Sequence, residues 1–466
     1  MTETNHEIRF IENMQDALLH IRNLLGGRAV DGTSGAERYP GTLRAKLEVM
    51  HPADIAYILE ALPIAQRLQV WELVKSERDG EVLIGVSGAV RASLLATMNH
   101  EELGAAAGQL DTAEIADLAP DLPQSVLREV FKSLAIAERE QLRSAMSYHK
   151  DAVGALMDFN MIAIRDDVSL DVVSRYLRRF GNLPTHTDQV FVVDRDSHLQ
   201  GVLPMHRIVV NRPEVMVSAI MLTDMVQLHP DDNASLAAQA FERYALVSAP
   251  VVDEDGKLVG RVTVNVVLDY VRTESERDLL NQAGLRAEDI FASVWKSAQN
   301  RWAWLALNLG AAFVASRVIA NFAGTIEKFV ALATLMPIIA GIAGNTATQT
   351  ATLIIRSLAL RKITQANGAR LLFKELGISI LNGLVWGGAA GLFAYYLYHD
   401  VALGWVMMGA MLLTLMLGAL VGLLIPMMLH KLGRNPASGS NVLPTAITAS
   451  GGFFIFLGLA TTFLMH

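Results

Sequence analysis

The chain contains no cysteine among its 466 residues. Disulfide bonds and thiolate metal sites are therefore excluded, although this absence leaves the redox compartment undecided. The phosphate-binding pattern GxxxxGK is also missing, which argues against an ATP-driven pump. Paired aspartates and the patterns HExxH and GxSxG are absent from the apolar segments. The sequence therefore does not favour an enzyme.

Acidic residues are scarce in the C-terminal part of the chain. Residues 301–466 hold ten Lys or Arg but only three carboxylates, Glu327, Glu375 and Asp400, a formal balance of +7. Residues 1–300 have a balance of −15. An acidic polar part followed by an apolar, slightly basic part predicts a cytoplasmic region joined to a membrane domain. It also argues against a nucleic-acid partner, which requires a basic face.

Five apolar spans follow residue 300. Each is long enough to cross the membrane lipid bilayer. They cover roughly 302–321, 329–356, 372–398, 401–429 and 439–465. Basic residues concentrate in the connections 356–374 and 430–438, which marks these as cytoplasmic. The N-terminal segment lacks the charge and apolar pattern of a signal peptide. We therefore expect a multi-pass protein of the cell (inner) membrane with a cytoplasmic N-terminus and an outer C-terminus.

The second span contains an uncharged polar stretch, MPIIAGIAGNTATQT at 336–350. Asn345 and Gln349 lie one helical turn apart in it and face one side. Such amides either form hydrogen bonds between membrane helices or line a water-filled path. Small residues recur in the later spans as GGAAG, GALVG and SGG, and for most of their glycines helix packing is the simpler interpretation.

The polar part contains an internal repeat. VVDRDSHLQGVL (192–203) and VVDEDGKLVGRV (251–262) align at an offset of 59, and a helical stretch flanks each copy on both sides. This order resembles a tandem pair of cystathionine-β-synthase (CBS) domains, which implies a regulatory module that often binds adenine nucleotides. The stretch Thr263-Val264-Asn265-Val266 lacks the carboxylate usual at its fourth place. The sequence therefore does not favour an adenine nucleotide here.

Residues 10–150 are typical of short amphipathic helices. HPADIAYILEALP (51–63) recurs as LDTAEIADLAPDLP (110–123), with Ile55 and Ile115 in register. Pro and Asp or Thr at the expected helix starts fit capping. We predict an all-α helical-repeat domain for interaction or sensing. After the CBS pair, residues 272–300 are expected to continue as one long charged helix into the first span.

Taken in order, these parts resemble the MgtE-type magnesium transporters or channels. The specific matches are YHKDAVGALM (148–157), RWAWL (301–305), MPIIAGIAGNTATQTATLIIRSLAL (336–360) and LIPMMLHKLGRNPASGSN (424–441). The resemblance implies passive Mg²⁺ uptake by a homodimer in the lipid membrane, gated by cytoplasmic Mg²⁺. The implied domains are a helical-repeat superhelix (1–152), CBS 1 (153–212), CBS 2 (213–273), a connecting helix (274–300) and a five-helix transmembrane domain (301–466).

The resemblance also implies site residues. The pore-lining candidates are Asn345, Gln349, Asn441, Thr445, Thr448 and Ala449, and the candidates for cytoplasmic metal sensing are Asp269, Glu274 and Asp278. Ala449 stands where the family has a pore aspartate, while Asn265, Val266 and Arg277 replace acidic residues near the sensor. Two alternatives therefore stay open: a member selective for another divalent cation, or a membrane-anchored regulatory protein that has lost transport.

Overall fold

The structure is a computed structural model that describes residues 18–19, 21–22, 38–74, 76–285, 291–359, 363, 368–439 and 442–465. The chain divides into two compact units. The N-terminal unit comprises residues 1–273 and 289–291, and the membrane unit comprises 274–288 and 292–466. Each unit is described by itself below.

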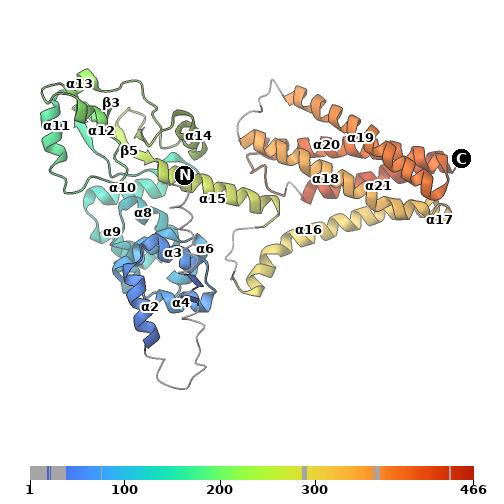
Figure 1. Ribbon diagram of the computed structural model, residues 1–466, viewed down its shortest axis with the longest axis horizontal. Helices are drawn as coiled ribbons and strands as arrows, with labels where there is room; N and C mark the ends of the chain where they lie inside the picture. Colours follow the sequence, from blue (N-terminus) through green and yellow to red (C-terminus); the bar gives the residue numbers. More distant parts are fainter. Residues whose placement is uncertain are drawn as a thin grey trace, which may run out of the picture. The chain divides into compact units, whose positions relative to one another are not determined.

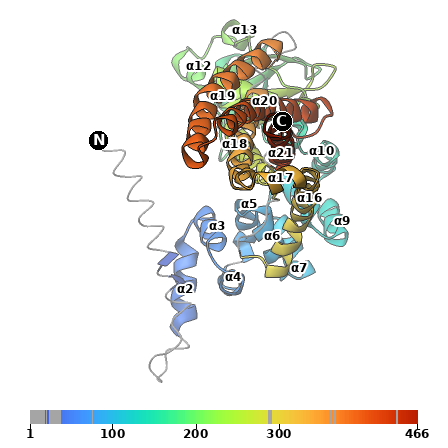
Figure 2. The ribbon, with the colours of Figure 1, turned by 90° about the vertical axis from the view of Figure 1, so that its right-hand side faces the viewer.

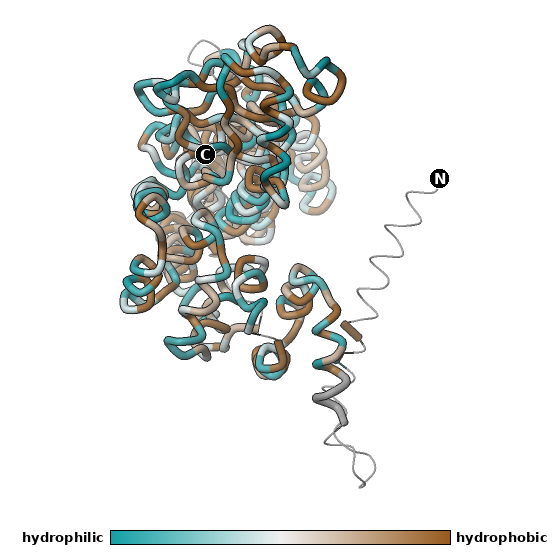
Figure 3. The backbone as a smooth tube through the Cα atoms, turned by 90° about the vertical axis from the view of Figure 1, so that its left-hand side faces the viewer, coloured by the Kyte–Doolittle hydropathy of each residue, from teal (hydrophilic) through white to brown (hydrophobic). Residues whose placement is uncertain are grey.

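The N-terminal unit begins with a stack of short helices, in which apolar and polar positions alternate along the chain (Figure 3). The repeat predicted from the sequence is confirmed, because Ile55 and Ile115 are 0% and 1% exposed in two neighbouring cores. Asp111 forms a capping box with Glu114, which satisfies free amides at the start of its helix. The helices are α2 (Arg38–Val49), α3 (Pro52–Glu60), α4 (Ile64–Trp71), α5 (Asp79–Gly85), α6 (Gly88–Leu95), α7 (His100–Ala107), α8 (Thr112–Leu118), α9 (Gln124–Ser133) and α10 (Ile136–Ser147), with short 3₁₀ turns η1 (Ser76–Arg78), η2 (Ala119–Asp121) and η3 (Val153–Leu156).

Two small sheets follow and have the predicted repeated order of strands and helices. One sheet has the order β1-β2-β3, in which β1 is parallel to β2 and β3 is antiparallel to it. The other is the antiparallel pair β4-β5. The two hairpin turns contact each other, since the amide of Leu258 donates to the carbonyl of Ser197. The strands are β1 (Ala163–Arg165), β2 (Gln189–Val193), β3 (Leu199–Pro204), β4 (Ser248–Val252) and β5 (Leu258–Thr263); the helices are α11 (Leu170–Leu177), α12 (Met205–Val210), α13 (Val217–Ile220) and α14 (Ala234–Tyr244).

The connecting segment differs from the prediction of a single helix over 272–300. Helix α15 (Val264–Gln282) ends two residues before Gly284, which has a positive φ of 71°. Glycine at such a position commonly ends a helix, because it adopts the left-handed conformation without a steric penalty. A new helix, α16 (Val294–Ala320), then begins before the predicted first span and continues through it. The prediction of one continuous helix was therefore wrong.

Five helices of the described residues are long and apolar enough to cross a membrane, which confirms the predicted number of spans. They are α16, α18 (Ala331–Ala359), α19 (Gly368–Tyr398), α20 (Val401–Lys431) and α21 (Val442–Leu464), and the short helix α17 (Ala323–Lys328) lies between the first two. Helix α20 is central, because it packs against α18, α19 and α21 (Figures 1 and 2).

Glycines bring these helices together, as the packing interpretation predicts. A Cβ at Gly391 of α19 would lie 2.6 Å from the carbonyl oxygen of Gly404, and one at Gly383 would lie 2.8 Å from Leu412. Both neighbours belong to α20. On its other side, a Cβ at Gly418 would lie 2.9 Å from the carbonyl oxygen of Ala343 in α18. Backbone approaches this close leave no room for a side chain.

Candidate functional site

Helix α18 has two chemically different faces within the membrane unit. Ala343, Ala347 and Ala351 are buried, and the first two lie against the glycines of α20. Asn345 and Gln349 are exposed on the other side, four residues apart and therefore on one face. The only amides of this long apolar helix thus point away from the core of the unit.

Helix α21 lies beside this polar face. A Cβ on Gly344 would lie 3.3 Å from Cγ2 of Thr445, so the residue next to Asn345 contacts the N-terminal turn of α21. Thr445 is exposed, and Ala449, one turn later on the same face, is partly exposed. The structure thus brings four of the predicted residues, Asn345, Gln349, Thr445 and Ala449, onto two adjoining helices.

Of the two other pore-lining candidates, Thr448 lies within the described residues and is placed differently. Thr448 is 0% exposed, and its hydroxyl lies 2.8 Å from the carbonyl oxygen of Pro444 and 3.1 Å from that of Thr445. Its side chain therefore bonds to its own helix and packs inside the unit. Asn441 lies outside the described residues.

The described wall offers neutral oxygen atoms from amides and a hydroxyl. Such groups suit a cation that keeps much of its hydration shell, as Mg²⁺ does. Ala449 supplies no ligand where the family pattern has a carboxylate. A carboxylate of α19, Glu375, bonds to Thr350, the residue that follows Gln349 in α18.

Glu375 lies near the start of the third predicted span, 372–398. Helix α19 begins earlier, at Gly368, so Glu375 lies within the helix, and it is only 6% exposed. The hydroxyl of Thr350 in α18 donates to its Oε2 at 3.3 Å. The sequence contained one signal for this position: a carboxylate close to a long apolar run is costly unless it faces the interior of the bundle.

The three candidates for metal sensing lie on α15 but do not converge. Asp269 is exposed, and it lies about two and a half turns before Asp278, hence on the opposite face of the helix. Glu274 forms an ion pair of 2.6 Å with Arg277, one of the residues that replaces an acidic one in the family pattern. Asp278 accepts a hydrogen bond of 2.9 Å from the side-chain amide of Asn435, in the connection between α20 and α21.

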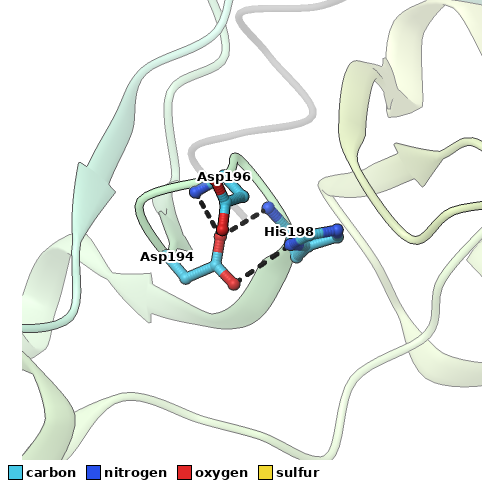
Figure 4. A group of neighbouring side chains, drawn as sticks. All are labelled: Asp194, Asp196 and His198. Carbon is cyan, nitrogen blue, oxygen red and sulfur yellow. Dashed lines mark hydrogen bonds and ion pairs between the residues drawn. The ribbon is translucent and has the colours of Figure 1, made fainter.

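A further acidic group lies in the turn between β2 and β3, which the sequence analysis did not single out as a metal site. Ligand atoms of Asp194, Asp196 and His198 lie within 4.8 Å of one another (Figure 4). Oδ1 of Asp194 accepts from the backbone amides of the other two, at 2.8 and 2.9 Å.

The second copy of the repeat explains this group. Asp253 accepts from the amides of Asp255 and Lys257 in the same way, at 3.0 and 2.8 Å. A lysine thus takes the place of the histidine while the turn is retained. The shared carboxylate therefore shapes the hairpin turn, a common use of aspartate.

Three family models match separate parts of the chain. The model described as the MgtE intracellular N domain matches residues 50–151, the CBS domain model matches 217–273, and the divalent cation transporter model of MgtE matches 336–459. The last range contains the polar face of α18 and all the described candidates on α21. The N-terminal domains are thus the cytosolic part of a multi-pass membrane protein.

Curated relatives cover nearly the whole chain. The magnesium transporter MgtE of Thermus thermophilus is 29% identical over 91% of this chain and 95% of its own length. The magnesium transporter MgtE of Bacillus subtilis is 25% identical over 90% of this chain and 94% of its own length. A solved cytosolic domain of the Mg²⁺ channel MgtE in complex with ATP is 29% identical, covers 49% of this chain and 93% of that structure, and has a TM-score of 0.45.

The order of the matched models repeats the order of the observed parts: short helices, a CBS hairpin, and long apolar helices with a glycine-packed core. The chain belongs to the MgtE family of divalent cation transporters.

Proposed function

We propose that two copies of this chain form a passive pathway for divalent cations, with Mg²⁺ as the default ion, across the inner membrane. One observation carries the proposal: the amides of Asn345 and Gln349 are exposed on a membrane-crossing helix, beside Thr445 of a second such helix. The basic residues in the connections 356–374 and 430–438 support an arrangement in which the N-terminal unit lies inside the cell and the C-terminus outside.

Physical chemistry explains why this polar face requires a partner. Polar groups that face hydrocarbon without a hydrogen-bond partner are costly, so polar side chains on membrane helices face a bundle interior or a water-filled cavity. A second copy related by a twofold axis, the commonest symmetry of oligomers, would cover the face and leave water between the copies. Amide and hydroxyl oxygens would then contact the hydration shell of a passing cation.

The proposal includes gating by cytoplasmic Mg²⁺. The C-terminal part of α15 bonds to the connection between α20 and α21 through Asp278 and Asn435. Binding of Mg²⁺ at acidic residues of α15, with Asp269, Glu274 and Asp278 as candidates, would change how this helix holds that connection. The cytosolic domains thereby gain a mechanical route to the pathway.

Ion flux into proteoliposomes tests the central claim. We expect Mg²⁺ uptake driven by an inside-negative potential, compared with Co²⁺, Ni²⁺ and Ca²⁺. Gln349→Leu should reduce the flux at least about tenfold, because a hydrated ion loses an oxygen contact at a constriction. Thr334→Val is the matched control, since that hydroxyl of the same helix already bonds to Tyr398 of α19 at 2.5 Å. Absence of flux for all four ions would rule the proposal out.

The absence of cysteine provides a direct test of the second copy. Asn345→Cys would be the single thiol in each chain, so an oxidant can link only one copy to another through this position. We expect a disulfide-linked dimer and loss of flux on oxidation. Leu353→Cys, one turn after Gln349, serves as a second position on the same face. Thiols that label from water but never cross-link would contradict a twofold pathway here.

Ala449 favours a second candidate function, because the family pattern has a pore aspartate there. Without that charge, the pathway would prefer another divalent cation, or the protein would act as a membrane-anchored regulator that no longer transports. The comparison of four cations separates the first possibility from Mg²⁺ transport. For the second, isothermal titration of the full chain with Mg²⁺ and with an adenine nucleotide, in the absence of any measurable flux, would identify the ligand that is sensed.

A further inference from the structure

Glu375 is the one carboxylate buried within the described helices of the membrane unit. Glu375 is 6% exposed. Two hydroxyl residues, Thr350 and Ser379, are also buried, at 4% and 2% exposed. Ser379 lies one turn further along α19 on the same face. Hydroxyl residues are common where membrane helices pack, whereas an ionisable residue inside a membrane bundle is expensive and points to a function.

The neighbouring helices close the space around this carboxyl group. Gly422 of α20 lies so near α18 that a Cβ there would be 3.0 Å from Cβ of Thr350. Pro426 follows four residues later in α20 and has no N–H to bond the carbonyl of Gly422. Thr350 therefore links the two neighbouring helices: its Cβ lies against Gly422 of α20, and its hydroxyl bonds to Glu375 of α19.

The negative charge of Glu375 is not cancelled by a neighbour in the described part of the chain. Its recorded partner is the hydroxyl of Thr350 at 3.3 Å, and the described residues form no ion pair with it. A hydroxyl orients toward a carboxylate but does not cancel its charge. In its ionised form, the Glu375 carboxylate would extend its field across α18.

Thr350 is buried while the adjacent Gln349 is exposed, so Thr350 and the carboxyl group bonded to it lie on the inner side of α18, away from the proposed wall. An α-helix with its side chains is about 10 Å across, and we take this width as the separation between the carboxyl group and an ion beside Gln349. Over that distance, at an effective dielectric constant of about 20, one charge alters the binding constant of a dication by more than about tenfold. The effect on a monovalent ion is the square root of that factor, because the energy is proportional to the ion's charge.

We propose that Glu375 determines the preference of the pathway for divalent over monovalent cations, through its field across α18 rather than by direct contact. This inference rests on the proposed function. It assigns to α19 the charge that α21 lacks at Ala449. The carboxylate acts from behind the wall, so the wall itself needs only neutral oxygens to hold the hydration shell.

The test compares Mg²⁺ and K⁺ flux through the full chain in proteoliposomes with that through Glu375→Gln. Glutamine keeps the shape and the acceptor for Thr350, so a purely structural role predicts parental behaviour. We expect the half-saturating Mg²⁺ concentration to rise about tenfold and the Mg²⁺ over K⁺ preference to fall by at least about threefold. Asp400→Asn is the control. It removes a carboxylate charge at the N-terminus of α20, and the asparagine side chain can still accept from the backbone amides of Ala402 and Leu403.

A second pair of variants covers the possibility that glutamine disturbs folding. Glu375→Asp and Glu375→Asn have the same length and differ in charge, so only the aspartate should retain the divalent preference. Parental affinity and selectivity in Glu375→Gln, or equal losses in the Asp and Asn variants, would overturn the assignment. If the parent transports divalent cations and Glu375→Gln leaves that transport unchanged, only this inference is refuted. If the parent transports no divalent cation, both the proposed function and this inference are refuted.

Discussion

The side-chain amide of Asn435 donates a hydrogen bond of 2.9 Å to Asp278, which joins the C-terminal turns of α15 to the connection between α20 and α21. Asn435 is held in place, since its Oδ1 accepts from the amide of Ala437 at 2.8 Å. A second bond runs from the amide of Gly439 to the carbonyl oxygen of Asn281, at 3.2 Å. The end of α15 is thus fastened to the segment that leads into the polar start of α21.

Breaking this fastening should weaken the proposed gating by cytoplasmic Mg²⁺. Asp278→Ala and Asn435→Ala are each expected to raise Mg²⁺ flux at a given cytoplasmic Mg²⁺ concentration, as the midpoint of inhibition in proteoliposomes will show. A hydrogen bond to a charged group contributes about 1.5–3 kcal/mol, so the double variant should add little to either single one. Fully additive effects would mean that the two side chains act independently.

The close contact of Gly439 with Trp304 makes a prediction about stability. Gly439 has a φ of 66°, and a Cβ there would lie 2.7 Å from Cζ3 of the Trp304 ring. Gly433 has a φ of 68° but open space around it, so it is a matched control for backbone strain alone. We expect Gly433→Ala to cost about 1 kcal/mol and Gly439→Ala about 2 kcal/mol more.

The unfolding midpoint of the purified full chain, followed by tryptophan fluorescence, measures this difference. Addition of Trp304→Ala to Gly439→Ala should restore part of the loss, because it removes the ring that the new methyl group meets. Equal midpoints for the two glycine variants would show that the ring moves aside without cost.

Asp79 predicts a pH dependence in the N-terminal unit. Burial, with a smaller contribution from the charge of Glu102, raises the pKa of Asp79 from 3.8 to about 6. The folded state therefore binds more protons than the unfolded state between these two values, so stability falls as pH rises from about 4 to about 6. Because the side chain is partly exposed, we expect solvent screening to limit the effect to about 1 kcal/mol.

The variant Asp79→Asn should remove this dependence and stabilise α5 at neutral pH. Hydrogen exchange of the α5 amides measures the difference in local stability between the variant and the parent. The two proteins are compared at the same pH, so the intrinsic effect of pH on the exchange rate cancels. A variant that is less protected than the parent at pH 7 would show that the carboxylate has a favourable partner in the folded state.

The position of Ala449 predicts a gain of affinity. It lies one turn after Thr445 on the partly exposed face of α21. Helices α18 and α21 are antiparallel, since Gly344 adjoins Thr445 and Gly452 adjoins Ile339. Ala449→Asp would therefore add a charge to the wall on the side of Asn345 that lies away from Gln349. We expect the half-saturating Mg²⁺ concentration to fall at least about tenfold, because a near carboxylate attracts a dication strongly in a medium of low dielectric constant. Ala449→Asn adds the same bulk without charge and should leave the affinity within about twofold of the parent. Equal affinities for the two variants would place Ala449 away from the ion.

Much of the fold could be predicted from the sequence because it follows from local patterns. The apolar runs determine five spans, and the repeated hairpin at an offset of 59 gives two strand pairs, as observed at β2–β3 and β4–β5. The connecting helix was mispredicted for a local reason that was present in the sequence. Gly284 ends α15, and the charged pattern on either side of it concealed this.

The sequence by itself determined the family, the order of the parts and the polar face of α18, since Asn345 and Gln349 are four residues apart on any helix. Only the tertiary structure decided which polar groups meet across helices. Thr448 turned out to bond to its own backbone, Asp278 to Asn435, and Glu375 to Thr350. The pairing of Glu375 with Thr350 depends on how closely α18 and α19 pack around α20, where Gly422 lies against Thr350. Such contacts are a property of three-dimensional packing that spacing along one chain does not encode.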